Sequence, residues 1–418
     1  MRIADAPVRA YTGESLAAAS LASDERVLSR SLKYHRPRTY FCFEGHCSGC
    51  LVRIDGIPNQ RACVTPCHAG AQVVPQNAFP SAEIDLLGAV DFLFRRGMDH
   101  HTLMTGNSVL NQLANKVVRQ LSGLGKLPTQ ATPGLPAVAI HRVDACVIGG
   151  GPAGLAAATA LARAGRSVVI CDDQLHPGGS LRADPRTGRE AATAAWDAAL
   201  ATGVTVLARA TAIGFFGEDG GPGETGVLAV AAPDRLHRVY ARSWVWATGG
   251  YPMNLPFPDN DRPGILAARG VGRLLIDHGI LAGDKICLVE APAMATDAAV
   301  LAAALTAAGA EVARVAQSAV SGTRGRGWVK AVDTAAGKVE CDVVAVAALP
   351  APASEGARQQ GCEVVLDPAA GGFKIVVDAS GRTSVPGVWA CGDVTGYRGP
   401  AASAIDGARV AANVLASS

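Results

Sequence analysis

The sequence predicts an α/β protein in which two strand–helix–strand units of the nucleotide-binding kind follow a small α+β domain. Three observations lead to this class. A glycine-rich turn joins a predicted strand to a predicted helix within residues 145–164, and a second strand–helix–strand pattern covers residues 286–315. Five of the 11 cysteines lie between Cys42 and Cys67. With 418 residues, of which 49% are hydrophobic, the chain can form two or three domains with sizeable cores.

Composition and charge argue against several classes of protein. The net charge is +2 without a polybasic block, so neither nucleic acid nor an anionic membrane surface is an expected partner. Aromatic residues make up only 5%, too few for base-stacking platforms. Met1–Ala10 lacks a signal-peptide pattern, and no apolar run reaches the roughly 18 residues of a transmembrane helix. We therefore expect a cytoplasmic protein, whose odd number of cysteines favours metal or redox use over disulfides.

Residues 1–80 form the first predicted domain. Val8–Tyr11 is expected to be a strand, followed by a turn and a helix that ends near Ala22. Further strands are predicted at Leu51–Ile54 and Gln72–Val74. These elements make a small α+β unit whose cysteine content is too high for an ordinary core.

Residues 81–137 are predicted to be a helical connection that ends in a linker. Apolar residues recur at helical spacing in residues 84–93 and again in residues 109–121. Glycine and proline then become frequent, so the linker is expected at residues 127–137.

Two further domains complete the predicted organisation. Residues 138–263 and 349–418 together form a nucleotide-binding domain, and residues 264–348 form an insert of similar type. The insert has a predicted strand at Ile286–Val289 and a helix at Ala298–Ala308, but the turn between them contains no glycine.

The turn of the first nucleotide-binding unit has the spacing Gly149-x-Gly151-x-x-Gly154. The first glycine permits the turn, the second lets the backbone approach a pyrophosphate, and the third lets the helix pack closely on the strand. The start of the helix supplies N–H groups and a positive dipole for the phosphates. The candidate binding residues in this turn are Gly149, Gly151, Pro152, Ala153 and Gly154.

Asp172 ends the next predicted strand, 18 residues after Gly154. A carboxylate at this place accepts hydrogen bonds from ribose hydroxyl groups. The alternative is a tight turn that holds no ligand. The strand–helix–strand–acid order favours a dinucleotide site.

The spacing Cys42-x4-Cys47-x2-Cys50, followed after 12 intervening residues by Cys63, predicts a [2Fe–2S] cluster bound by these four thiolates. Small residues in the loop, including Gly45 and Gly49, would let N–H groups turn toward the sulfurs. The alternative is a structural zinc site. Zinc ribbons favour paired Cys-x2–4-Cys elements, and Cys63 has no near partner other than Cys67. Cys67 is expected to be a partly buried thiol.

The segment Cys42–Val52, together with Arg61-Ala-Cys63, resembles plant-type and xanthine-dehydrogenase-type ferredoxin domains. The segments Lys33–Arg38, Gly97–Thr102 and Asn260–Gly264 extend the similarity. Together they resemble the alpha subunit of heterotetrameric sarcosine oxidase and related subunits of hydrogen cyanide synthase, opine oxidase and hydroxyproline dehydrogenase. This resemblance implies a ferredoxin-like (β-grasp) domain at residues 1–80. It also implies a partner flavoprotein subunit of the amino-acid oxidase type within a hetero-oligomer.

The sequence departs from that family in two ways. Sarcosine oxidase alpha subunits have this N-terminal fold without the cysteines, which are present here. They also continue into a folate-binding-like domain, whereas this sequence ends at Ser418. We therefore expect electron transfer through a cluster and no folate chemistry.

The first nucleotide site is similar to that of two-dinucleotide-domain (FAD/NAD(P)-type, Rossmann-like) flavoproteins, because a Gly-Asp pair follows a late predicted strand. The resemblance implies FAD, with Asp172 at the adenosine ribose and Asp393 at the ribityl chain. NAD in this site is the alternative. Further candidate cofactor residues are Gly179, Thr248, Gly249, Gly392 and Asp393. The insert at residues 264–348 is where such proteins bind NAD(P), and its glycine-free turn leaves that cofactor open.

No catalytic acid, base or nucleophile stands out in the sequence. Cys171 and Cys391 are expected to be small buried residues, and His100 and His101 to be structural. The expected function is an FAD-dependent oxidoreductase subunit that relays electrons between FAD and the cluster, in a complex acting on the CH–NH group of an amine or amino acid. The alternatives are a self-sufficient NAD(P)H-dependent ferredoxin-type reductase and an assembly subunit with structural cofactors. The substrate, the terminal acceptor and the stoichiometry are not predicted.

Overall fold

The computed structural model describes residues 1–3, 6–31, 35–86, 109, 111–112, 137–217 and 226–417. The chain divides into two compact units. Residues 1–132 form the N-terminal unit together with Asp261–Ile265 and Arg324–Val329, and the rest forms the nucleotide-fold unit. The predicted helices beyond residue 86, almost all of the predicted linker, and Gly97–Thr102 with its two histidines lie outside the described residues.

The N-terminal unit contains a five-stranded mixed sheet in the order β2-β1-β7-β5-β6. Strand β7 pairs parallel with β1 and antiparallel with β5. The helix α1 (Leu16–Ala22) begins after Ser15, whose side chain accepts a hydrogen bond from the Ala18 N–H. The strands are β1 (Arg2–Ile3), β2 (Ala6–Pro7), β5 (Leu51–Ile54), β6 (Ile57–Arg61) and β7 (Gln72–Val74). A separate pair is formed by β3 (Ser29–Arg30) and β4 (Pro37–Arg38).

The predicted strand at Val8–Tyr11 is wrong. Residues 8–11 have no strand structure, and the N-terminal strands lie earlier, at Arg2–Ile3 and Ala6–Pro7. These two segments pair as an antiparallel hairpin, and the buried Ile3 is the residue that anchors it. Residues 8–11 are therefore not part of the sheet.

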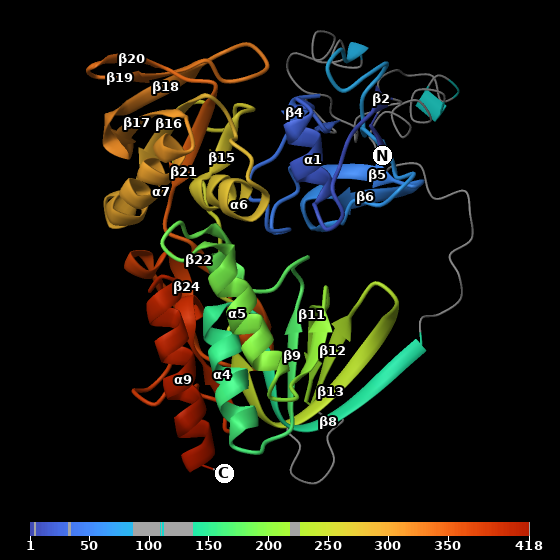
Figure 1. The fold of residues 1–418 in the computed structure, drawn as a ribbon, viewed down its shortest axis with the longest axis vertical. Coiled ribbons are helices and arrows are strands. Elements are labelled where there is room, and N and C mark those ends of the chain that lie inside the picture. The colour runs from blue at the N-terminus through green and yellow to red at the C-terminus, as the bar shows by residue number, and fades with distance from the viewer. Residues whose placement is uncertain are drawn as a thin grey trace. The chain divides into compact units, whose positions relative to one another are not determined.

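The nucleotide-fold unit contains a seven-stranded sheet in the order β10-β9-β8-β13-β12-β11, with β25 also paired to β13. Figure 1 labels β8, β9, β11, β12 and β13 of this sheet. Strands β10, β9, β8, β13 and β25 are mutually parallel. Strands β11, β12 and β13 form an antiparallel meander. The strands are β8 (Ala137–Ile148), β9 (Val168–Asp172), β10 (Thr205–Ala208), β11 (Thr211–Phe216), β12 (Val227–Ala231), β13 (Arg235–Trp246) and β25 (Val388–Ala390).

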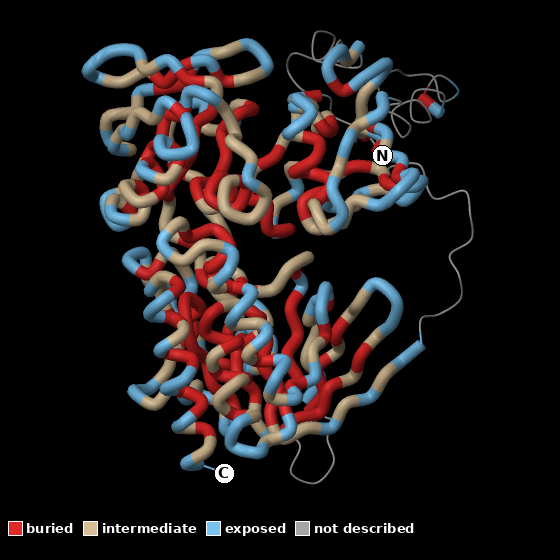
Figure 2. Tube along the Cα trace, in the orientation of Figure 1, coloured by how far each residue is buried: buried red, intermediate tan, exposed pale blue. Residues whose placement is uncertain are grey.

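Helices α4 (Pro152–Arg163), α5 (Gly188–Leu200) and α9 (Pro400–Ala416) lie on one side of this sheet (Figure 1). Their apolar residues form a buried core with the sheet, seen as the buried segments of Figure 2. A Cβ atom on Gly407 would lie 2.0 Å from the Ala153 carbonyl oxygen, so glycine is required where α9 meets α4. Helix α4 begins at Pro152, earlier than the predicted Leu155, because proline fits the first position of a helix.

A second sheet has the order β15-β21-β16-β17. Strand β16 pairs parallel with both β21 and β17, so β16, α7 and β17 form the predicted second strand–helix–strand unit. Its elements are β15 (Ile265–Ala267), α6 (Ala268–His278), β16 (Lys285–Glu290), α7 (Ala295–Ala307), β17 (Glu311–Ala316) and β21 (Val343–Ala347). Next to it, β18 (Val320–Arg324), β19 (Ala331–Thr334) and β20 (Gly337–Glu340) form a three-stranded sheet.

Smaller elements lie before and after the second sheet in the sequence. They are β14 (Gly250–Tyr251), β22 (Ala351–Pro352), α8 (Glu355–Gln359), β23 (Val364–Asp367) and β24 (Gly372–Ile375). Among the described residues, no helix is long and apolar enough to cross a membrane. The four predicted domain ranges and the predicted location remain predictions.

Candidate functional site

Four cysteines of the N-terminal unit bring their sulfur atoms together. Cys42 and Cys47 lie on the loop before β5, Cys50 directly precedes that strand, and Cys63 lies in the short 3-10 helix after β6. Cys42 Sγ lies 3.3 Å from Cys47 Sγ, and Cys50 Sγ lies 3.4 Å from Cys63 Sγ. Two thiolates on one tetrahedral ion with bonds of about 2.3 Å would lie about 3.8 Å apart. Each pair therefore has nearly the separation expected of two ligands to one metal ion.

Backbone N–H groups of the loop point at these sulfurs. The Gly45 N–H donates to Cys63 Sγ at 3.2 Å, and the Glu44 and Gly49 N–H groups donate to Cys42 and Cys47 at 3.4 and 3.5 Å. Gly45 has a φ of +75°, which favours glycine. A Cβ atom on Gly49 would lie 2.3 Å from the Thr39 carbonyl oxygen. The donor set and its hydrogen bonds fit a thiolate-bound cluster.

Hydrogen bonds among the four sulfur atoms lower the pKa of two thiols and raise the pKa of the other two. The pKa of the Cys42 thiol is strongly lowered by its hydrogen bonds with Cys47 and Cys63, and the pKa of Cys50 is lowered by its hydrogen bond with Cys63. The pKa of Cys47 and that of Cys63 are raised by the same hydrogen bonds. Cys67 instead contacts Met1 at 3.9 Å, and burial raises its pKa to about 11.

The first nucleotide turn has the geometry that its glycines predict. Gly149 has a φ of +109°, and a Cβ atom on Gly154 would lie 1.9 Å from the Gly149 carbonyl oxygen. A Cβ atom on Gly151 would have only the Gly179 Cα atom nearby, at 3.9 Å, so the space over this glycine is open. Gly151 is the N-cap of α4, followed by Pro152 and Ala153. The turn therefore offers free space at the start of a helix, as a pyrophosphate requires.

Asp172 lies at the end of β9 beside this turn, where it is 9% exposed. Its Oδ2 accepts from the Gly150 N–H at 2.7 Å and its Oδ1 from the Gln174 N–H at 3.0 Å. Burial, followed by the charge of Asp173, raises the pKa of Asp172 to about 6. Each carboxylate oxygen can accept a second hydrogen bond, so a ribose hydroxyl can still be bound.

The remaining predicted cofactor residues gather at the same edge of the sheet. Strands β9, β8, β13 and β25 are adjacent and parallel, so the residues that follow them lie together. Gly178 donates its N–H to the Gly150 carbonyl at 2.8 Å, which holds Gly179 next to Gly151. The Thr248 hydroxyl donates to the Ala353 carbonyl at 2.7 Å, and Gly249 accepts from the Ala353 N–H at 3.0 Å.

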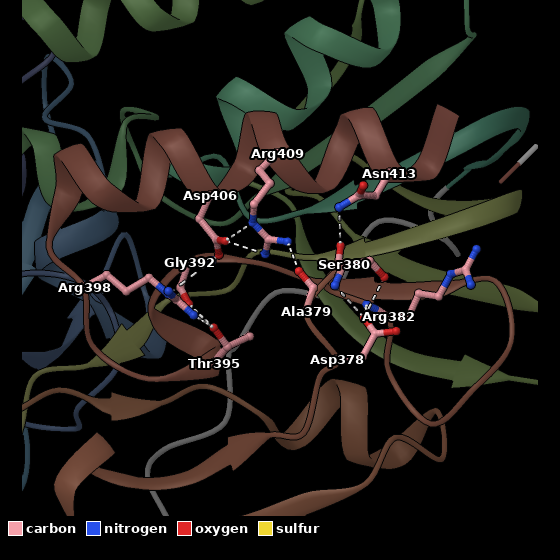
Figure 3. Close-up of polar contacts among 10 residues, drawn as sticks. All are labelled: Asp378, Ala379, Ser380, Arg382, Gly392, Thr395, Arg398, Asp406, Arg409 and Asn413. Atoms are coloured by element: carbon pink, nitrogen blue, oxygen red, sulfur yellow. Dashed lines mark hydrogen bonds and ion pairs between the residues drawn. The ribbon is translucent and has the colours of Figure 1, made fainter. Parts of the chain in front are cut away.

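The Gly392–Asp393 turn is held by a carboxylate that sequence reasoning missed. Asp406, on α9, accepts from the Gly392 N–H at 2.8 Å and from Arg409 Nη2 at 2.7 Å (Figure 3). Asp393 Oδ1 accepts from the Arg398 N–H and from the Ser403 hydroxyl, both at 2.9 Å. The only signal for Asp406 in the sequence is a lone acidic residue near the start of an alanine-rich helix.

The second nucleotide fold replaces glycine with acidic side chains. Glu290 ends β16 and binds Arg314 through two contacts to Arg314 Nη2 and one to Nε, at 2.8 to 3.0 Å. Asp297 lies in the first turn of α7, where it accepts from Arg186 at 2.5 Å and from the Tyr397 hydroxyl at 2.8 Å. Beside Asp297 lies a largely apolar cavity of about 100 Å³, lined in part by Met253, Met294, Leu301 and Val346.

Several other residues named in the sequence analysis are buried or paired with a charged side chain. Cys171 and Cys391 are buried in the two cores that flank the seven-stranded sheet. His35 is buried and pairs with Asp85 at 2.9 Å, and Arg36 pairs with Asp261 at 2.7 Å.

Comparison with protein families identifies three segments. Residues 1–78 match the 2Fe-2S iron-sulfur cluster binding domain, and residues 147–206 match the NAD(P)-binding Rossmann-like domain. Residues 280–413 match the pyridine nucleotide-disulphide oxidoreductase family. These matches confirm the predicted fold class and support a [2Fe–2S] cluster and FAD as cofactors.

Known relatives extend over most of the chain. The sarcosine oxidase subunit alpha of Rhizobium meliloti is 32% identical over 92% of this chain, and this chain spans 40% of that protein. The hydrogen cyanide synthase subunit HcnB of Pseudomonas aeruginosa is 29% identical over 43% of this chain and 39% of its own length.

Solved structures show the same fold. L-proline dehydrogenase from P. horikoshii aligns over 100% of this chain and 72% of its own, with a TM-score of 0.75 and 18% identity. Thioredoxin reductase from T. acidophilum aligns over 66% of this chain and 99% of its own, with a TM-score of 0.52 and 21% identity. The chain is therefore a homologue of the sarcosine oxidase alpha subunit, with the fold of an FAD-dependent oxidoreductase and an N-terminal 2Fe-2S domain.

Proposed function

We propose that this chain is the iron–sulfur flavoprotein subunit of a complex that oxidises an amine or amino acid of the sarcosine, opine or hydroxyproline type. In that role it relays electrons between FAD and a [2Fe–2S] cluster. The observation that carries the proposal is the convergence of four thiols, in pairs 3.3 and 3.4 Å apart, in the same chain as an open dinucleotide turn. The relationship to sarcosine oxidase alpha subunits supports the substrate class.

The N-terminal unit would hold the cluster through Cys42, Cys47, Cys50 and Cys63. When bound, the cluster supplies one-electron transfer. The N–H groups of Glu44, Gly45 and Gly49 favour negative charge on the sulfurs and therefore stabilise the more negative, reduced state. The zinc alternative uses the same ligands but provides no electron transfer.

The nucleotide-fold unit would hold FAD at the carboxyl edge of its parallel strands. The turn at Gly149–Gly154 and the start of α4 would bind the pyrophosphate, and Gly179 would line the same space. Asp172 would accept from the adenosine ribose, and Asp393 would lie at the ribityl chain, beside Thr248 and Gly249. When bound, FAD supplies exchange between two-electron and one-electron carriers.

The relay requires a partner that performs the oxidation. Breaking the C–H bond of a CH–NH group to form an imine releases two electrons and two protons. A partner flavoprotein subunit of the amino-acid oxidase type would accept them, and this chain would carry the electrons away. The two relatives named above are themselves described as subunits, which supports a hetero-oligomer.

The test is purification of the full chain with the products of its neighbouring genes under anaerobic conditions. A panel of secondary amines and imino acids is then assayed with a dye acceptor. We expect dye reduction by at least one of them, together with iron–sulfur and flavin absorbance. Absence of an iron–sulfur spectrum would contradict the cluster assignment, and dye reduction that persists in Cys63→Ser but not in a partner-free sample would contradict the relay.

A second candidate function is an NAD(P)H-dependent ferredoxin-type reductase. It is favoured by the match of residues 280–413 to the pyridine nucleotide-disulphide oxidoreductase family. The carboxylates of Glu290 and Asp297 at the second turn argue against it, because a pyrophosphate is itself anionic. Anaerobic mixing with NADH or NADPH separates the two: rapid loss of flavin absorbance supports the reductase, and none removes it.

A further inference from the structure

The loop at residues 174–179, which follows β9, forms one wall of the first dinucleotide turn. The Gln174 N–H binds the Asp172 carboxylate at 3.0 Å, and the Gly178 N–H binds the Gly150 carbonyl at 2.8 Å. A Cβ atom on Gly179 would lie 2.8 Å from the Gly151 Cα atom. A displacement of this loop would therefore move the groups that surround the pyrophosphate and ribose positions.

Arg273, on helix α6 of the second nucleotide fold, binds both ends of this loop. Its Nη1 donates to the Gln174 side-chain oxygen at 2.9 Å, and its Nη2 donates to the Gly179 carbonyl at 3.1 Å. The two acceptors lie five residues apart, on either side of the loop. One planar guanidinium can bridge two such acceptors, whereas an ammonium is a single point charge on a flexible stem.

A second arginine joins the middle of the loop to the same helix. Arg182 Nε donates to the Pro177 carbonyl at 2.5 Å, and its Nη1 binds Asp277 at 2.6 Å. Asp277 follows Arg273 by four residues, so the two side chains lie on one face of α6. A Cβ atom on Gly272 would lie 2.5 Å from the Ala183 carbonyl oxygen, so α6 approaches this region as closely as only glycine allows.

Arg273 is buried, and its two bonds to the loop are made at the cost of one donor that has no partner in the part of the chain that the structure describes. It is 6% exposed, and within the described residues its Nε is buried without a hydrogen-bond partner. An apolar side chain would fill such a site without an unsatisfied donor. The positive charge also lowers the pKa of Asp172, in opposition to burial, and so favours the ionised form that binds a ribose hydroxyl.

We propose that Arg273 is a positioning residue for the first dinucleotide site: from the second nucleotide fold, it holds the 174–179 loop against the glycine turn and thereby sets the affinity for the dinucleotide. The inference rests on the proposed FAD site. It assigns to α6 a role in binding a dinucleotide that does not occupy the fold to which α6 belongs.

The test compares FAD binding by the full-length wild-type chain and the Arg273→Lys variant, both as apoprotein. Lysine keeps the charge and removes the bridge. We expect the dissociation constant for FAD to rise at least tenfold, with the melting temperature of the apoprotein changed little. The matched control is Arg382→Lys, because Arg382 contacts Ser417 and Trp389 rather than the 174–179 loop. The FAD affinity of this control should stay within twofold of wild type.

The variant Gln174→Ala supplies a second measurement that remains informative if Arg273→Lys folds poorly. It removes one acceptor of the bridge, so by itself it should weaken FAD binding, and unchanged FAD affinity in Gln174→Ala would also overturn the inference. Where Arg273→Lys is folded, the effects of the two substitutions should not add. Unchanged affinity in Arg273→Lys, or full additivity with Gln174→Ala, would overturn the inference while leaving the proposed function intact. A wild-type chain that binds neither FAD nor NAD⁺ at this site would instead overturn both.

Discussion

The two nucleotide folds of this chain share a parallel strand–helix–strand arrangement and differ at the turn between strand and helix. After β8 the turn consists of three glycines, and the space above Gly151 is open. After β16 the turn contains no glycine, Glu290 ends the strand, and Asp297 lies in the first turn of the helix. The same topology thus provides an anion site in one case and two carboxylates in the other. The fold alone does not determine which turn binds a dinucleotide.

The second fold nevertheless contributes to the first site. Its helix α6 supplies Arg273 and Asp277, which bind the loop beside the glycine turn directly or through Arg182. This arrangement gives the second fold a structural role that does not depend on its binding a nucleotide of its own.

The largest expected effect is that of Gly154→Val. Even the first carbon of a side chain would lie 1.9 Å from the Gly149 carbonyl oxygen, so α4 must move away from β8. We expect loss of FAD from the purified protein and destabilisation of about 3 kcal/mol. Bound flavin per chain and thermal unfolding measure this. Gly217→Ala is the control, because its Cβ atom would meet no described atom within 4 Å. A wild-type flavin content in Gly154→Val would contradict the assigned turn.

Asp172→Asn should have the next largest effect. The effect on the stability of the apoprotein differs from the effect on FAD binding. The pKa of Asp172 is raised by burial from 3.8 to about 6, so the native apoprotein binds a proton more readily than the unfolded chain. This group therefore reduces the stability of the apoprotein as the pH rises from about 4 to about 6, by about 3 kcal/mol in total. Above that range the penalty stays constant.

Asparagine removes that titration. Denaturant unfolding of the apoprotein between pH 4 and 7 should therefore show a smaller loss of stability with pH in Asp172→Asn than in wild type. FAD binding should weaken about tenfold, because one ionised acceptor for the ribose is lost. Identical pH dependence of the two proteins would contradict the assigned burial of the carboxylate.

The residues around the two cofactor sites differ in whether the sequence alone could predict them. Gly149, Gly154 and Asp172 follow from local spacing around one strand and one helix, as do the four cysteines on their loop. Asp406 and Arg273 could not be predicted in the same way. They reach the site only because α9 and α6 pack against elements more than 90 residues earlier in the chain, such as α4 and the 174–179 loop. The prediction of a strand at Val8–Tyr11 failed for the opposite reason. The local sequence favoured a strand, but this segment is not paired with the sheet.

Asp406→Asn tests the far side of the first site and should have a smaller effect. The amide can still accept from the Gly392 N–H, but Arg409 loses a charged partner. We expect destabilisation of about 1–2 kcal/mol and about threefold weaker FAD binding. Thermal unfolding and flavin titration check this, with Asp367→Asn, at a half-buried ion pair with Lys374, as the control. A loss as large as that of Gly154→Val would place Asp406 within the ligand contacts rather than behind them.

The smallest effect is expected at the turn of the second nucleotide fold. Replacing both carboxylates of the second turn, in Glu290→Gln with Asp297→Asn, removes one negative charge from the end of β16 and one from the first turn of α7. We expect NADH binding to increase by no more than about fivefold, because the turn still lacks the glycines that admit a pyrophosphate. Equilibrium titration with NADH measures this. Tight NADH binding by the wild-type chain would show that the two turns are functionally alike.

The most direct test of the central claim is a reductive titration of the anaerobically purified full chain, followed by absorbance and electron paramagnetic resonance. Cys63→Ser and Cys67→Ser are titrated in parallel, because Cys63 belongs to the sulfur pairs and Cys67 contacts Met1 instead. The account predicts uptake of about three electrons per chain in wild type and in Cys67→Ser, two by the flavin and one by the cluster, and about two in Cys63→Ser. Uptake of about two electrons by the wild-type chain, with no paramagnetic iron–sulfur signal, would contradict an electron relay in this protein.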